Sequence, residues 1–102
     1  MQRLVYQVAK DHGWWEDEDP NVLEKIALMH SELGEATEEY RLGLAPMYYI
    51  DGKPEGLAIE LADVVIRVMD FCEHFGIDLE QMLIHKNEFN KTRPYRHGDK
   101  KA

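Results

Sequence analysis

The sequence has little cysteine, few basic residues and no long hydrophobic run. Cys72 is the only cysteine, so no disulfide can form within the chain, and a reducing compartment suits it. The 12 lysines and arginines against 20 acidic residues give a formal net charge of -8, which argues against a broad basic surface for DNA or RNA. No apolar run approaches the roughly 20 residues that span a bilayer, and the first residues lack the apolar core of a secretory signal. We therefore expect a cytoplasmic protein that binds neither a membrane nor a nucleic-acid polymer.

No tract rich in glycine, serine and proline divides the chain, so its 102 residues are expected to form one domain. Apolar residues recur at helical spacing in four segments, which predicts an all-α fold. The predicted helices cover about residues 2–12, 20–42, 55–75 and 79–91. Proline and glycine between the second and third helices predict a loop over residues 44–54, and no pair of strands is expected. A basic tail, residues 92–102, follows the last helix.

Two of the predicted helices carry clear start signals. Asp19 followed by Pro20 places an acceptor side chain before a proline at the first helical position, which predicts the start of the second helix. Asp78 with Gln81 three residues later has the spacing of a capping box and predicts the start of the fourth helix.

Acidic residues gather on one side of each of the two central helices. Successive helical residues turn by about 100°, so Glu32, Glu35 and Glu39 fall within an arc of roughly 60° beside the apolar stripe of the second helix. The third helix is apolar around most of its circumference, and its polar residues are spaced 3, 4, 3 and 4 apart in one narrow stripe. The residues of this stripe are Glu60, Asp63, Arg67, Asp70 and His74.

Two interpretations of these acidic faces are open. Each face could simply be exposed to solvent. If the two faces meet instead, four or more carboxylates converge in a partly buried place, where they must take up protons, pair with cations or bind a metal ion. Oxygen ligands at that density favour a hard divalent ion such as Mg²⁺ or Mn²⁺ over zinc.

The fourth predicted helix carries positive charge on the side of its apolar residues. Lys86 and Asn90 share a face with Leu83, so they point the way the core-facing residues do. A lysine in this position can extend along apolar surface, pair with an acidic residue or reach a phosphate, and Arg93 and Arg96 follow just beyond.

Two acidic tetrapeptides resemble the motif of a known family. Glu32-Leu33-Gly34-Glu35 is followed, after 24 intervening residues, by Glu60-Leu61-Ala62-Asp63. This pair is similar to the ExxE and ExxD motifs of the MazG-like, all-α nucleoside triphosphate pyrophosphohydrolases. The similarity continues through Lys86, Asn90 and Arg93 to the closing Arg-Pro-Tyr-Arg-His-Gly, and covers about residues 21–98.

This resemblance implies a four-helix MazG-like fold and an enzyme that uses Mg²⁺, with Mn²⁺ able to substitute, to cleave nucleoside triphosphates. The implied metal ligands are Glu32, Glu35, Glu60 and Asp63. The implied triphosphate contacts are Lys86, Asn90 and Arg93. Water would attack the α-phosphorus and pyrophosphate would leave, and either Glu39 or a spare ligand oxygen would accept the proton of the water. Trp14 and Trp15 are expected either to stack on the base or to anchor a loop.

The third predicted helix has more apolar circumference than three short helices can cover, so a homodimer or homotetramer with helices packed across its interface is expected. Three alternatives accompany the main prediction. One is an enzyme like phosphoribosyl-ATP pyrophosphohydrolase, and another is a non-enzymatic helical module whose acids are paired by Lys25, Arg67 and Lys86. A ferritin-like di-iron protein would need Glu-x-x-His pairs that the sequence lacks.

Overall fold

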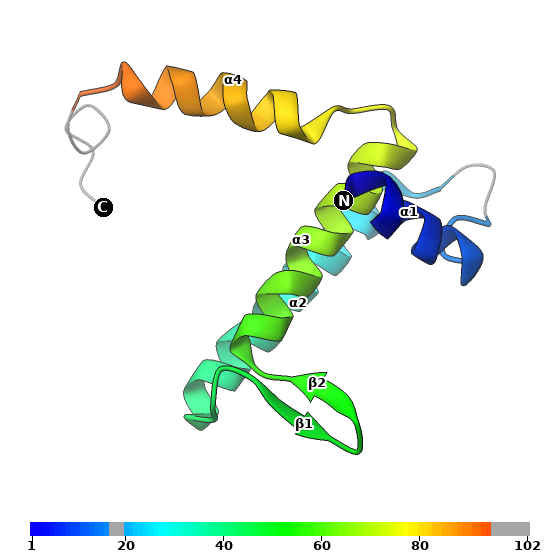
Figure 1. Cartoon of the computed structure of the whole chain (residues 1–102), viewed down its shortest axis with the longest axis vertical. Helices are drawn as coiled ribbons and strands as arrows, with labels where there is room; N and C mark the ends of the chain where they lie inside the picture. Colours follow the sequence, from blue (N-terminus) through cyan, green and yellow to red (C-terminus); the bar gives the residue numbers. More distant parts are fainter. Residues whose placement is uncertain (17–19, 95–102) are drawn as a thin grey trace.

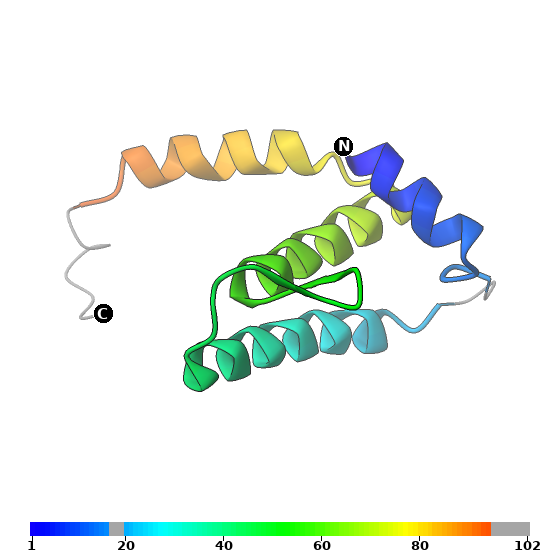
Figure 2. The ribbon, with the colours of Figure 1, turned by 60° about the horizontal axis from the view of Figure 1, so that its bottom comes forward.

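The computed structural model describes residues 1–16 and 20–94, which form four α-helices and one β-hairpin (Figure 1). The elements are α1 (Gln2–Asp11), α2 (Val22–Leu42), β1 (Tyr48–Ile50), β2 (Lys53–Glu55), α3 (Leu57–His74) and α4 (Leu79–Lys91). The helices α2 and α3 lie side by side and run in opposite directions, and α1 packs against α3. The hairpin joins α2 to α3 at the end of this pair that lies away from α1 (Figures 1 and 2).

The four predicted helices are confirmed, but the predicted start of the second is wrong. α2 begins at Val22 rather than at Pro20, because the Asn21 side chain accepts a hydrogen bond from the backbone N–H of Glu24 and caps the helix there. Asp19, the predicted cap, lies outside the described residues.

The other helix starts follow from equally local causes. α3 begins at Leu57 rather than at residue 55, because Glu55 pairs in the hairpin. α4 begins as predicted, since the Asp78 side chain accepts a hydrogen bond of 3.2 Å from the backbone N–H of Gln81.

The prediction of a loop over residues 44–54 without paired strands is wrong. β1 and β2 pair in antiparallel register, with Tyr48 opposite Glu55. The two turn residues, Asp51 and Gly52, have φ values of 50° and 81°, and a two-residue type I′ turn requires positive φ at both positions, which Asp-Gly favours. The all-α prediction is therefore corrected to a mostly helical fold with a small two-stranded sheet.

The described chain buries few apolar side chains. Trp15, Ala36 and Cys72 are its buried apolar residues. Large apolar side chains remain exposed along α3 and α4, among them Leu61, Val65, Ile66, Met82, Leu83 and Phe89. An isolated copy thus leaves apolar surface uncovered on two helices, a feature typical of interaction surfaces.

α4 stands apart from the other helices (Figures 1 and 2). It is held near its first residue, where the backbone N–H of Leu79 donates to the side-chain oxygen of Gln2 at 3.3 Å. Residues 80–91 are all exposed. Within the described residues, none of the helices is both long enough and apolar enough to cross a membrane.

Candidate metal centre

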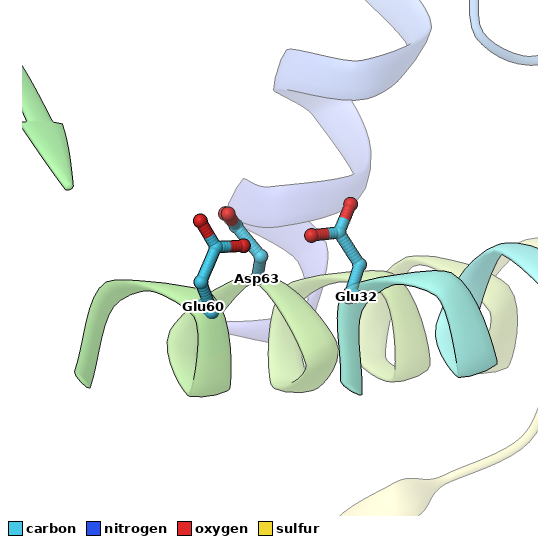
Figure 3. A group of neighbouring side chains, drawn as sticks. All are labelled: Glu32, Glu60 and Asp63. Atoms are coloured by element: carbon cyan, nitrogen blue, oxygen red, sulfur yellow. The ribbon is translucent and has the colours of Figure 1, made fainter. Parts of the chain in front are cut away.

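Three carboxylates from two helices meet beside the contact between α2 and α3. Glu32 comes from α2, and Glu60 and Asp63 come from successive turns of α3. One oxygen from each of these side chains lies within 4.8 Å of the other two. Figure 3 shows the three carboxylates on the same side of the helix pair. The two predicted acidic faces therefore do meet.

Glu60 is the most enclosed member of this group. Its exposed fraction is 7%, against 9% for Glu32. The Oε2 atom of Glu60 is fully buried and has no hydrogen-bond partner among the described residues. Removing a carboxylate oxygen from water without a partner is costly, so this atom needs a proton or a cation.

The pKa values of Glu60 and Asp63 are raised, as expected for carboxyl groups crowded in a partly buried place. Burial, a hydrogen bond with Glu35 and the negative charges of Glu35 and Asp63 together raise the pKa of Glu60 to about 7. Burial, followed by the charge of Glu32, also raises the pKa of Asp63, although Arg67 opposes this shift. The Glu35 carboxylate accepts a hydrogen bond from the protonated form of Glu60, so the fourth predicted ligand lies at the same place. All four predicted ligands are thus neighbours, and they disfavour one another's ionised form.

Arg67 is the positive charge nearest to the group. Its Nε donates to Glu32 Oε1 at 3.0 Å, and this ion pair is largely shielded from solvent. The guanidinium carbon lies 4.3 Å from the centroid of the Trp14 ring. Arg67 therefore fixes one oxygen of Glu32, and among residues 1–16 and 20–94 no ion pair reaches Glu60.

A second acidic group adjoins the first and shares Glu60 with it. Oxygens of Glu39, Glu55 and Glu60 lie within 4.8 Å of one another. The Tyr48 hydroxyl donates to both carboxylate oxygens of Glu39, at 2.9 Å each. Sequence reasoning missed Glu55 and Tyr48 because both are positioned by the hairpin, for which Asp51-Gly52 was the available signal.

The two tryptophans make contacts within the protein. Trp15 is buried, its Nε1 donates to Asp70 Oδ1 at 2.6 Å, and its ring stacks on His74 with centroids 3.9 Å apart. The Lys25 ammonium lies over both indole rings, at 4.4 Å from the Trp14 centroid and 4.6 Å from that of Trp15. These contacts match the loop-anchoring alternative, and the stacking of a base on either ring stays a prediction.

The structure does not bring the predicted triphosphate contacts to the carboxylates of the same chain. Lys86 and Asn90 lie on α4, which runs apart from α2 and α3 (Figure 2). The charged groups of Lys86 and Arg93 lie 4.9 and 5.7 Å from the centroid of the Phe89 ring. No ion pair joins them to the acidic groups within the described part of the chain. Arg96 lies outside that part.

Comparison with known proteins gives no family for this chain. No protein-family model matches the sequence, and no curated protein or solved structure matches it. The resemblance of the two acidic motifs therefore stays a prediction, and the candidate site depends on its own geometry.

Proposed function

We propose that this protein is a nucleoside triphosphate pyrophosphohydrolase that converts ribo- or deoxyribonucleoside triphosphates to a monophosphate and pyrophosphate in the upkeep of nucleotide pools. The cofactor is Mg²⁺, with Mn²⁺ able to substitute, and its ligands are Glu32, Glu35, Glu60 and Asp63. The observation that carries the proposal is the buried, unpartnered Oε2 of Glu60 inside a group of carboxylates from two helices.

The donor set fits a hard divalent cation. Glu32 and Asp63, which group with Glu60 beside α2 and α3, offer carboxylate oxygen, the ligand type that Mg²⁺ and Mn²⁺ prefer. A cation there would compensate the burial and the neighbouring negative charges that raise the pKa of Glu60. It would also supply a partner for the buried Glu60 oxygen.

The chemistry divides between the bound ion and the side chains. A divalent ion held by Glu32, Glu60 and Asp63 would neutralise phosphate charge and would orient the triphosphate for in-line attack at the α-phosphorus. Glu39, or an oxygen of a ligand carboxylate, accepts the proton of the attacking water. Because the Tyr48 hydroxyl already donates to Glu39, this carboxylate is held in a fixed orientation.

We also propose that the working form is a homodimer or homotetramer. Lys86, Asn90 and Arg93 lie with α4, away from the carboxylates of their own chain, and α4 exposes Met82 and Phe89. Packing of α4 against a second copy would cover this apolar surface and offer a route for the triphosphate contacts to reach a neighbouring site. We place the base beside Trp14, whose ring adjoins Arg67, since Trp15 is buried and already stacked on His74.

The second candidate function is a non-enzymatic helical interaction module. The ion pair between Arg67 and Glu32 favours this candidate, because the arginine compensates part of the acidic charge without a metal ion. The two candidates differ in their response to ligands. An enzyme should melt at a higher temperature when Mg²⁺ and a nucleotide are added, whereas the module should not change.

The direct test is to incubate the protein with Mg²⁺ and a panel of ribo- and deoxyribonucleoside triphosphates plus phosphoribosyl-ATP, and to separate the products by chromatography. Monophosphate without diphosphate identifies cleavage of the α–β bond. Glu60→Ala and Asp63→Ala should lower turnover by more than about 100-fold, in line with losing several kcal/mol of metal-based stabilisation. Glu38→Ala, an exposed acidic position on the same helix as Glu39, is the matched control and should keep full turnover. Absence of cleavage across the panel would contradict the proposal.

A further inference from the structure

We propose that Arg67 is a further substrate-binding residue, which pairs with Glu32 while no cation is bound and binds a phosphate of the triphosphate once a cation replaces it on Glu32. The inference rests on the proposed function, since it assigns a new contact to the same substrate. It supplies a positive charge from α3 of the same chain, whereas Lys86 and Arg93 lie apart with α4.

The guanidinium of Arg67 uses one of its donors on the protein. Its Nε donates to Glu32 Oε1 at 3.0 Å, and this is its one side-chain hydrogen bond within residues 1–16 and 20–94. The terminal nitrogens of an arginine carry further N–H donors. Because Glu60 Oε2 is the one buried polar side-chain atom without a partner in that part of the chain, the terminal nitrogens of Arg67 reach the surface. A fork of open donors beside carboxylates that suit a cation fits phosphate oxygens.

Trp14 holds this guanidinium in a fixed orientation. The guanidinium carbon lies 4.3 Å from the centroid of the Trp14 ring. Lys25 anchors the same indole, because its ammonium donates to the backbone oxygen of Trp14 at 3.2 Å and lies 4.4 Å from the ring centroid. The side chain of Arg67 is 28% exposed, so most of it is packed against the protein. A stacked, half-buried arginine loses less freedom on binding an anion than an arginine that extends into solvent.

The charge of Arg67 acts on ligands from both helices of the metal centre. Arg67 follows Asp63 by one turn of α3, and its charge opposes the rise in the pKa of Asp63. It also pairs with Glu32, which belongs to α2. With a divalent cation on these two carboxylates, Arg67 is no longer needed to neutralise them and is repelled by the ion. Its donors then become available to a phosphate oxygen beside the same carboxylates.

This exchange predicts two effects of opposite sign. Without a substrate, Arg67 competes with the cation for Glu32, so removing its charge should tighten the binding of the cation. With a triphosphate present, Arg67 adds a contact, so removing it should weaken the binding of the triphosphate. Replacing a residue that only supports the fold would weaken both. The opposite signs therefore identify the exchange.

The test compares the wild type with Arg67→Gln, which removes the charge, and with Arg67→Lys, which keeps the charge but lacks the planar fork. Binding of Mn²⁺ alone is measured by electron paramagnetic resonance of the free ion. Binding of inorganic tripolyphosphate at saturating Mn²⁺ is measured by calorimetry, which makes the result independent of the base. Circular dichroism of each variant establishes that its helices are formed.

Arg67→Gln should bind Mn²⁺ about 3- to 10-fold more tightly and tripolyphosphate at least about 10-fold more weakly than the wild type. Arg67→Lys should bind Mn²⁺ like the wild type, but it should also bind tripolyphosphate more weakly. The matched control is Arg3→Gln, which removes an exposed arginine of α1 and should leave both affinities unchanged.

The outcomes separate this inference from the proposed function. Mn²⁺ binding that is not tightened in Arg67→Gln would overturn the exchange and leave the metal centre in place. Tripolyphosphate binding that is absent from the wild type, or equal in the wild type and Arg67→Gln, would overturn the phosphate contact and likewise leave the metal centre. No bound Mn²⁺ in the wild type would overturn both the role of Arg67 and the metal centre of the proposed enzyme.

Discussion

Replacing Glu60 with glutamine should stabilise the metal-free protein at alkaline pH, although most substitutions of buried residues destabilise. The pKa of Glu60 is raised from 4.5 to about 7 by burial and by its acidic neighbours. Below about pH 4.5 the group is protonated in both the folded and the unfolded chain. The protonated Glu60 carboxyl contributes stability at low pH. This contribution is lost as the pH rises through about 7, because the folded chain must then hold Glu60 as a buried negative charge.

The size of the effect follows from the shift. Each pKa unit corresponds to about 1.4 kcal/mol, so the shift sets an upper limit of about 3 kcal/mol. Solvent reaches neighbouring members of the group such as Glu35, which is exposed, and screening reduces the expected gain to about 1–2 kcal/mol. Glutamine keeps the shape of the side chain and removes the charge.

The assay is unfolding by urea with a chelator present, at pH 5 and at pH 8 and at one protein concentration. Glu60→Gln should exceed the wild type by about 1–2 kcal/mol at pH 8 and should match it closely at pH 5. Added Mg²⁺ should reverse the order at pH 8, because only the wild type keeps its full set of ligands. A variant that is less stable than the wild type at pH 8 without metal would refute the reasoning about crowded carboxylates.

Three further predictions concern the support of the site. Trp15→Phe removes the 2.6 Å hydrogen bond to Asp70, which is 3% exposed, and should cost about 2–3 kcal/mol in thermal unfolding; an unchanged melting temperature would contradict the anchoring role. Gly52→Ala places an alanine at a φ of 81° and should cost about 1 kcal/mol, whereas Gly52→Asn should cost less because asparagine tolerates this region; equal melting temperatures would speak against the turn. Cys72 is 6% exposed and burial raises the pKa of its thiol, so iodoacetamide should alkylate it at least about 100-fold more slowly in the folded protein than in urea; equal rates would place the thiol at the surface.

Much of the site could be predicted from the sequence because helices have a fixed period. The spacing of Glu32 and Glu35, and of Glu60 and Asp63, places each pair on one face whatever the helices pack against. The long apolar circumference of the third helix then requires a neighbour, and α2 supplies it. Periodicity predicted which carboxylates share a face, but it left open whether the two faces meet, and the structure brings them together.

The hairpin could not be predicted in the same way. Its strands are three residues each, too short for an alternating pattern, and Pro54 lies in the second strand. The proline is tolerated because a two-stranded sheet consists of edge strands only. Asp51-Gly52 was the single local signal, and without it Glu55 and Tyr48 had no predicted place beside Glu39.

The position of the predicted triphosphate contacts shows a second limit of prediction from sequence. Amphipathic spacing indicates which residues of a helix share a face, and Lys86 and Asn90 do share one. Spacing does not indicate whether that face packs within the same chain. In the structure α4 stands apart and its residues 80–91 are exposed, and the Lys86 ammonium lies over the Phe89 ring of the same helix rather than beside the carboxylates of α2 and α3.

The most direct measurement is the anomalous scattering of crystals grown with Mn²⁺. The account predicts a strong peak bound by oxygens of Glu32, Glu35, Glu60 and Asp63, between α2 and α3. A map without such a peak at saturating Mn²⁺, with Glu32 paired to Arg67 alone, would contradict it.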